Sequence, residues 1–185
     1  MKNLLVLSII GLLFVGMSAF RPNKLADGDT VEKINWMSIE DAIAASQKNP
    51  KKIMIDVYTD WCGWCKRMDA TTFSQADIVS YVNEHYYAVK LNAEQRETIT
   101  LGDEQYEFVA NGNRGYNQLA AVLLQGKLSF PSMVFLGEDF ANLSIVPGYQ
   151  TAPKMDKILH FFAENHYKTT PWADFDASFV SKIAE

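Results

Sequence analysis

The chain has 185 residues, 48% of them hydrophobic and 21% charged, with a formal net charge of -5. The apolar fraction excludes a wholly disordered chain, and an acidic balance without blocks of Lys and Arg argues against nucleic acid as a partner. Two cysteines allow one disulfide at most, whereas a structural zinc site usually takes four ligands, so the sequence raises the question of what two thiols do.

The N-terminus has the pattern of a secretion signal. Lys2 precedes an apolar run from Leu4 to Val15, and small residues follow it. A positive start, a short apolar core and small residues near the cleavage site predict export, with residues 1–19 as the signal peptide. The alternative is an uncleaved membrane anchor, since Leu4 to Phe20 is uncharged and approaches the length of a membrane span. Contact with a membrane is expected in that case alone.

Beyond a polar linker at residues 20–32, predicted strands and helices alternate. Ser38, with Asp41 three residues later, predicts the start of a helix that ends at Asn49-Pro50. Strands are expected at 33–36, 52–59, 86–91, 132–136 and 143–146, the last two as a hairpin, and further helices at 62–70, 75–84, 116–125, 153–167 and 170–185. This succession includes a strand–helix–strand unit and indicates an α/β fold.

The strand from Lys52 to Thr59 is predicted to be central, because it is apolar and β-branched, as strands covered on both faces are. Its exception is Asp56. A carboxylate inside such a strand is costly unless it is paired or functional. The alternative is that Asp56 faces solvent from a partly exposed strand.

A long polar segment, residues 92–115, follows the next strand. A short helix is expected at 103–110 and a turn at 111–115. Such a connection is either a lid or partner-recognition surface, or a neutral elaboration of the surface. At the other end of the domain, residues 168–185 are expected to form a helical extension.

The chemistry is expected in residues 61–66 (WCGWCK). A predicted strand enters this motif and a predicted helix leaves it, so Cys62 is placed at a helix N-terminus, where unpaired N–H groups and the helix dipole stabilise a thiolate. Cys62 is therefore the expected nucleophile. Cys65 lies three residues later on the same helical face and is the expected resolving thiol, which makes Cys62–Cys65 a redox-active disulfide. No other cofactor is expected.

Other uses of two cysteines are half of a zinc site and an inert structural disulfide. The chain has no second CxxC, and His85, His160 and His166 are not at ligand spacing, so no metal is expected. A disulfide that closes so short a loop restrains the unfolded chain little, which argues against a purely structural role. A peptide-hydrolysing cysteine enzyme would need a histidine partner that the sequence does not offer convincingly.

The segment from Asp56 to Lys66 (DVYTDWCGWCK) resembles the active-site segment of the thioredoxin superfamily. The resemblance extends over residues 33–167 and implies a three-layer fold, in which a central mixed sheet of four to five strands is flanked by helices. Within the superfamily, the segment is most similar to exported, longer thioredoxin-like proteins of bacteria that carry an aromatic residue between the cysteines. Here that residue is Trp64, where many members have a small residue or a proline.

The resemblance also implies roles for two charged residues. Asp56 matches the family carboxylate that is proposed to accept the proton of the resolving cysteine, Cys65. Lys90 matches the family lysine that approaches this acid. The alternative for Lys90 is a solvated side chain near the end of a strand.

Around the cysteines, the resemblance implies a substrate-binding surface. Phe130-Pro131 matches the family's cis-proline position, where the backbone of Phe130 would pair with an extended substrate. Gly148 matches a glycine that leaves room beside the active site, with an ordinary turn glycine as the alternative, and Trp61 matches an aromatic residue whose alternative role is core packing. The expected substrate-binding residues are Trp61, Gly63, Trp64, Phe130, Pro131 and Gly148.

Together these features predict an exported disulfide oxidoreductase of the bacterial periplasm, which reduces or isomerises protein disulfides. Its expected partners are disulfide-containing proteins and a membrane-bound or exported thiol electron donor, because an oxidising compartment supplies no reductant. The residues between the cysteines do not fix the direction of electron flow, since such motifs span potentials from about -270 to about -120 mV. The alternative function is a non-catalytic binding module or redox-gated adaptor that holds a partner protein on Trp61, Trp64 and Phe130.

Overall fold

A computed structural model describes residues 32–184 of the chain. The predicted signal peptide and most of the predicted linker therefore lie outside the described residues. Within the described part, no helix combines the length and the apolar character needed to cross a membrane.

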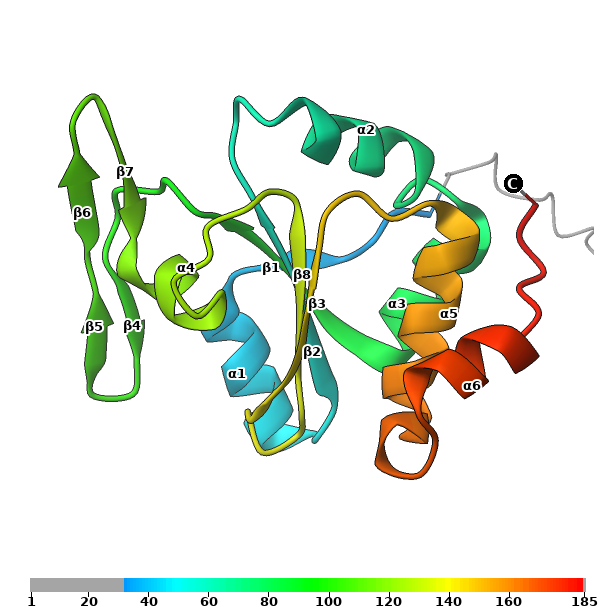
Figure 1. Cartoon of the computed structure of the whole chain (residues 1–185). Helices are drawn as coiled ribbons and strands as arrows, with labels where there is room; N and C mark the ends of the chain where they lie inside the picture. The colour runs from blue at the N-terminus through cyan, green and yellow to red at the C-terminus, as the bar shows by residue number, and fades with distance from the viewer. Residues whose placement is uncertain (1–31, 185) are drawn as a thin grey trace, which may run out of the picture. The chain divides into compact units, whose positions relative to one another are not determined.

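A five-stranded mixed sheet forms the centre of the fold (Figure 1). Its strands, in spatial order, are β1 (Trp36–Met37), β3 (Tyr86–Asn92), β2 (Lys52–Tyr58), β8 (Ser132–Leu136) and β9 (Asn142–Pro147). The first three strands run parallel to one another, whereas β8 is antiparallel to both β2 and β9. The sheet confirms the predicted α/β class and the central place of β2.

Helices cover both faces of this sheet, because alternate residues of its strands are apolar on each side. On β2, Ile53, Ile55 and Val57 belong to the core under α1 (Ile39–Lys48) and α4 (Gln118–Leu123). Met54, between them, points into the opposite core, under α3 (Ala76–His85) and α5 (Ala152–Ala163). Figure 1 shows the two helix pairs on opposite sides of the strands. The result is the predicted three-layer arrangement.

The helix that carries the cysteines, α2 (Gly63–Thr71), lies across the end of the sheet where β2 finishes (Figure 1). It follows β2 after a short turn, so the CxxC motif is held at the carboxyl end of the central strand. Ligand and catalytic sites of open α/β sheets lie at this edge. The fold thus presents the motif where chemistry is expected.

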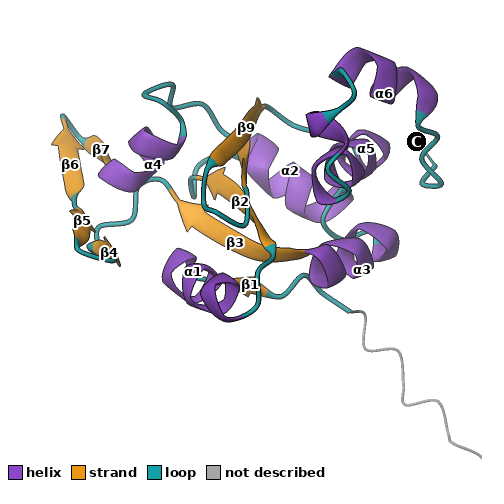
Figure 2. Cartoon of the chain, turned by 90° about the horizontal axis from the view of Figure 1, so that it is seen from below, coloured by secondary structure: helices purple, strands orange, loops and turns teal. Residues whose placement is uncertain are grey.

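The prediction of a helix at 103–110 is wrong. The segment instead forms two hairpins, which extend away from the sheet beyond α4 (Figure 2). The hairpins consist of β4 (Ile99–Leu101) with β5 (Glu104–Tyr106), and β6 (Phe108–Asn111) with β7 (Arg114–Asn117). Gly102 and Gly112 turn these hairpins with positive φ angles of 62° and 59°, a conformation that disfavours other residues.

Other element boundaries differ more modestly from the prediction. The strand expected at 33–36 is the short edge strand β1, and the helix expected from residue 116 begins at Gln118, since Asn117 caps it by accepting the Leu119 N–H. The helix expected to reach residue 167 ends at Ala163 and gives way to a 3-10 turn, η1 (His166–Lys168). In place of a helix over 170–185, the extension contains α6 (Trp172–Ser178).

Candidate active site

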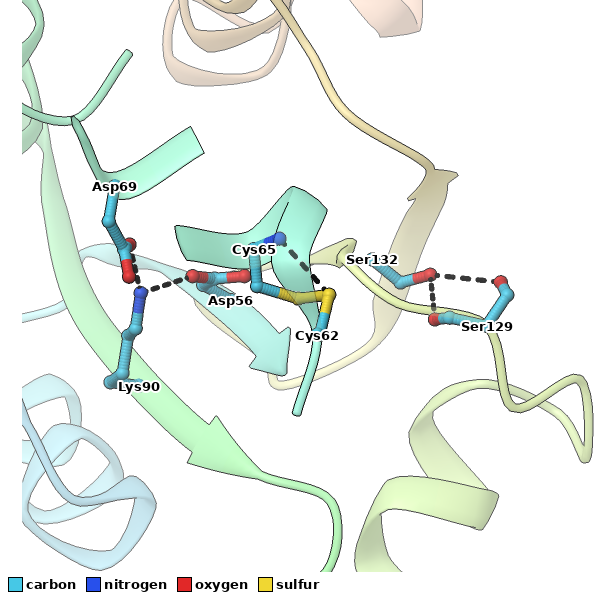
Figure 3. The surroundings of a disulfide bond; sticks show 7 residues. All are labelled: Asp56, Cys62, Cys65, Asp69, Lys90, Ser129 and Ser132. Carbon is cyan, nitrogen blue, oxygen red and sulfur yellow. Dashed lines mark hydrogen bonds and ion pairs between the residues drawn. A yellow bond between two sulfur atoms is a disulfide. The ribbon is translucent and has the colours of Figure 1, made fainter. Parts of the chain in front are cut away.

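Cys62 and Cys65 form a disulfide at the N-terminus of α2 (Figure 3). Cys62 is the N-cap residue, as the sequence predicts, and its Sγ accepts a hydrogen bond of 3.0 Å from the Cys65 N–H. Both residues are buried, with 4% of Cys62 and 1% of Cys65 exposed. When the disulfide is reduced, the backbone N–H groups of the first turn of α2 can therefore stabilise a Cys62 thiolate.

Behind the disulfide, the buried residue Asp56 pairs with a lysine from the neighbouring strand. Asp56 on β2 and Lys90 on β3 are direct partners in the parallel register, and the Lys90 Nζ lies 2.7 Å from Asp56 Oδ2. Asp56 is fully buried, so the alternative of a solvent-facing Asp56 is wrong. The alternative of a solvated Lys90 is wrong as well, because its side chain is 20% exposed and binds a second carboxylate, that of Asp69 on α2.

The other carboxylate oxygen of Asp56 has no hydrogen-bond partner among the described residues. Figure 3 shows the carboxylate between Lys90 and Cys65, with one oxygen directed to each. Burial raises the pKa of Asp56 from 3.8 to about 6, although Lys90 opposes this shift and Asp69 adds to it. Burial alone would lower the pKa of Lys90, but its two carboxylate partners bring it above the ordinary value. Asp56 can therefore exchange a proton near neutral pH.

The loop before β8 contains a cis peptide bond between Phe130 and Pro131, as the family resemblance implies. The Pro131 carbonyl accepts a 2.8 Å hydrogen bond from the Gly148 N–H, and Ser132 Oγ donates to the Ser129 carbonyl (Figure 3). Gly148 has a φ of 85°, and a side chain there would meet nothing within 4 Å. Its backbone conformation accounts for the glycine, while its role beside the active site stays a prediction.

Two tryptophans of the motif are exposed beside the disulfide. Trp61 is 52% exposed and contacts Phe130 edge to face, with ring centroids 6.0 Å apart, which joins the motif to the cis-proline loop. Core packing, the alternative for Trp61, is therefore wrong. Trp64 is 56% exposed and lies 5.5 Å from the Tyr149 ring. Gly63, between the cysteines, is the first residue of α2 and has nothing within 4 Å of its Cβ position.

Sequence reasoning missed three residues of this region. Asp69 lies four residues after Cys65 on α2, and this helical spacing was a usable signal for a side chain on the same face. Arg67 places its guanidinium 5.3 Å from the Trp64 ring and 5.5 Å from that of Tyr149. Arg114 lies in the turn predicted at 111–115, which the structure confirms, and its guanidinium lies 4.6 Å from the centroid of the Trp61 ring.

The three histidines are engaged elsewhere in the fold. His160 on α5 and His166 on η1 both contact Glu164, and His85 contacts the ring of Tyr81. None of these contacts involves the cysteines.

Solved structures show which fold this is. The chain is 18% identical to a DsbH oxidoreductase, with 78% of this chain and 95% of that chain covered and a TM-score of 0.51. A thioredoxin-fold protein from Helicobacter pylori gives 17% identity, coverage of 70% and 82%, and a TM-score of 0.55. For a thioredoxin from Thermus thermophilus the identity is 15%, the coverage 70% and 87%, and the TM-score 0.53. The fold is the thioredoxin fold.

The sequence itself gives the family. Residues 39–163 match the model of the thioredoxin-like domain, and the chain belongs to this family. No curated protein matches the chain significantly. Thioredoxin-fold proteins with a CxxC pair are generally thiol–disulfide oxidoreductases.

Proposed function

We propose that the protein is an exported thiol–disulfide oxidoreductase that reduces or isomerises protein disulfides. The observation that carries the proposal is the placement of Asp56: a fully buried carboxylate, with one oxygen unpartnered among the described residues, faces the disulfide from the central strand. A structural disulfide needs no such proton acceptor. A resolving thiol does, because it must lose its proton before it can attack.

In the reducing direction, the Cys62 thiolate attacks one sulfur of a substrate disulfide, and the other substrate sulfur leaves as a thiolate. Cys65 then transfers its proton to Asp56 and attacks the Cys62 sulfur. This step breaks the mixed disulfide, forms the Cys62–Cys65 bond and releases the second substrate sulfur. Two electrons pass from the protein to the substrate, and an external dithiol must return them. Lys90 holds Asp56 in place for this transfer.

The surface around the disulfide supports a peptide substrate. Phe130 lies just before β8 and outside its ladder with β2 and β9, which supports the proposal that its backbone pairs with an extended segment. Trp61, Trp64 and Phe130 offer apolar surface to the residues that flank the substrate cysteine. The proposed partners are therefore disulfide-containing proteins, with a membrane-bound or exported thiol protein as electron donor. Nucleic acid has no part in the proposal.

Export to the bacterial periplasm is proposed from the pattern of the first residues, Lys2 followed by an apolar run. Retention of this segment as a membrane anchor is the alternative location. Comparison of the N-terminal residue and of the membrane and soluble fractions in an expressing bacterium distinguishes the two.

Insulin reduction by dithiothreitol tests the catalytic claim. We expect the wild type to accelerate precipitation of the insulin B chain, and Cys62→Ser to abolish the acceleration. A wild type no faster than Cys62→Ser would remove the proposal. Asp56→Asn should retain the disulfide but slow turnover, since its side chain cannot accept the proton of Cys65.

Trapping identifies the substrates. In Cys65→Ser the mixed disulfide on Cys62 cannot be resolved, so substrate proteins should remain attached and be released by reductant. Cys62→Ser, Cys65→Ser is the matched control and should capture nothing covalently.

A second candidate function is a non-catalytic adaptor, favoured by the exposure of Trp61 and Trp64, both of which are more than half exposed. An adaptor would hold its partner through these rings without electron transfer. Retention of the same partner by Cys62→Ser, Cys65→Ser and its loss in Trp64→Ala would favour this function.

A further inference from the structure

A cleft of about 320 Å³ lies beside the candidate active site, between the CxxC motif and the second hairpin. Trp61 and Phe130 line it, together with Arg114 and Tyr116 from β7. Trp61 is the neighbour of Cys62, so whatever occupies the cleft is adjacent to a peptide bound at the disulfide. The second hairpin therefore adds surface beside Trp61, the residue that precedes Cys62.

Arg114 gives the cleft its chemistry. Its guanidinium lies over the Trp61 ring, 4.6 Å from the centroid, and within the described part of the chain no carboxylate lies within ion-pair distance of it. A stacked guanidinium keeps its in-plane N–H donors free for a carboxylate, and the stacking fixes the side chain before a ligand arrives. Arg114 is therefore positioned to bind an anion.

One acidic residue also lines the cleft. Glu94 follows β3 and is half-buried, and its backbone N–H donates to the Asn92 side chain. It makes no ion pair with Arg114. The two charges thus lie separately in the cleft, and Arg114 is the one stacked on the residue next to Cys62.

We infer that this cleft is a specificity subsite, in which Arg114 binds an acidic side chain that flanks the reacting cysteine of the substrate, while Trp61 and Phe130 pack against the stem of that side chain. The inference rests on the proposed oxidoreductase function and names the substrate class that the site prefers. Arg114 acts here in binding, and no electron or proton passes through it.

Three peptides test the preference. They share one intramolecular disulfide and differ at the residue beside the reacting cysteine, which is Glu, Gln or Lys. We expect the wild type to reduce the Glu peptide with a kcat/KM about fivefold above that of the Lys peptide, the upper end for an exposed ion pair. Half-molar NaCl should reduce this ratio, because salt screens exposed charges.

Variants of Arg114 assign the preference. Arg114→Gln should bring the Glu-to-Lys ratio close to one, and Arg114→Glu should reverse it. The matched control is Arg96→Gln, because Arg96 stacks on Phe108 of the same pair of hairpins, 4.7 Å from its centroid, but does not line the cleft. Arg96→Gln should keep the wild-type ratio.

The outcomes separate the two proposals. A wild type that reduces none of the peptides contradicts the proposed function, and binding of cysteine-free versions to Cys62→Ser, Cys65→Ser then still tests the subsite by the same Glu-to-Lys ratio. Equal reduction of all peptides overturns the subsite, as does a preference for Lys, which would assign the cleft to Glu94. If Arg96→Gln lowers the Glu-to-Lys ratio as much as Arg114→Gln does, the preference comes from the net charge of the protein, and the subsite is overturned.

Discussion

The Lys90 ammonium lies 2.7 Å from the Asp56 carboxylate, and yet the pKa of Asp56 is raised to about 6. The burial of Asp56 is complete, so the loss of hydration of the charged carboxylate outweighs the attraction of its partner. At neutral pH the ionised Asp56 carboxylate is therefore less favourable in the folded protein than in the unfolded chain. The arrangement of the pair leaves a carboxylate that takes up a proton in the range where thiols exchange.

This relationship predicts the pH dependence of stability. In the unfolded chain Asp56 ionises near its ordinary pKa of 3.8, and in the folded protein near 6, so the folded state holds more protons between these values. The free energy of unfolding must then fall as the pH rises through this window and stay lower above it. The difference between the two pKa values of Asp56 corresponds to a change of about 3 kcal/mol in the free energy of unfolding.

Asp56→Asn removes this dependence. We expect the oxidised variant to gain stability relative to the wild type as the pH rises from 4 to 8, by up to about 3 kcal/mol. Urea unfolding of both proteins across this range measures the difference, and other titrating groups cancel in the comparison. A variant whose relative stability does not change with pH would show that Asp56 ionises normally, and one whose relative stability falls with pH would show that the pKa of Asp56 is lowered; either result contradicts the raised pKa.

Asp69→Asn should lower the pKa of Asp56. Lys90 is shared between the two carboxylates, and the charge of Asp69 adds to the raised pKa of Asp56, so its removal leaves Lys90 to Asp56 alone. NMR titration of the Asp56 carboxyl carbon in the oxidised protein measures the shift. Asp60→Asn is the control, because Asp60 accepts a hydrogen bond from Asn92 and does not contact Lys90. An unchanged or raised pKa would contradict the shared pairing.

The parts of the site that the sequence predicts are those that local chemistry decides. The cap at Cys62 follows from a strand that meets a helix, and the burial of Asp56 from the apolar run around it. The pairing of Asp56 with Lys90 needed the family resemblance, because it depends on the register between β2 and β3, which are far apart in sequence.

The two hairpins show why the rest was not predictable. Residues 103–110 (DEQYEFVA) carry apolar side chains at spacings that fit a helix as well as a strand, and the hairpins are mostly exposed. Strand preference at such positions depends on cross-strand neighbours rather than on the residue itself. The second hairpin brings Arg114 onto Trp61, and no local sequence pattern predicts this stacking.

Gly115→Ala should destabilise the second hairpin. A Cβ at this position would overlap the Phe108 ring and the Val109 carbonyl oxygen across the hairpin, and the backbone oxygen cannot move aside without breaking the pairing. We expect a loss of about 1 to 3 kcal/mol in urea unfolding, with faster proteolysis of residues 99–117. Gly63→Ala is the stability control, since a Cβ added at this position would meet nothing within 4 Å. Equal stability of wild type and Gly115→Ala would contradict the close approach.

Phe175→Ala tests whether the C-terminal extension belongs to the folded unit. The family match ends at residue 163, but Phe175 of α6 is 5% exposed and its ring lies 5.1 Å from that of Phe161 on α5. Truncation of a buried aromatic side chain typically costs about 3 to 5 kcal/mol, which urea unfolding would detect as one cooperative transition at lower denaturant. Val180→Ala is the control, since Val180 is 84% exposed and its loss should cost less than about 0.5 kcal/mol. If Phe175→Ala lowers the free energy of unfolding no more than Val180→Ala does, α6 is not packed into the core. The expected difference would show that residues 168–184 belong to the domain that holds the cysteines.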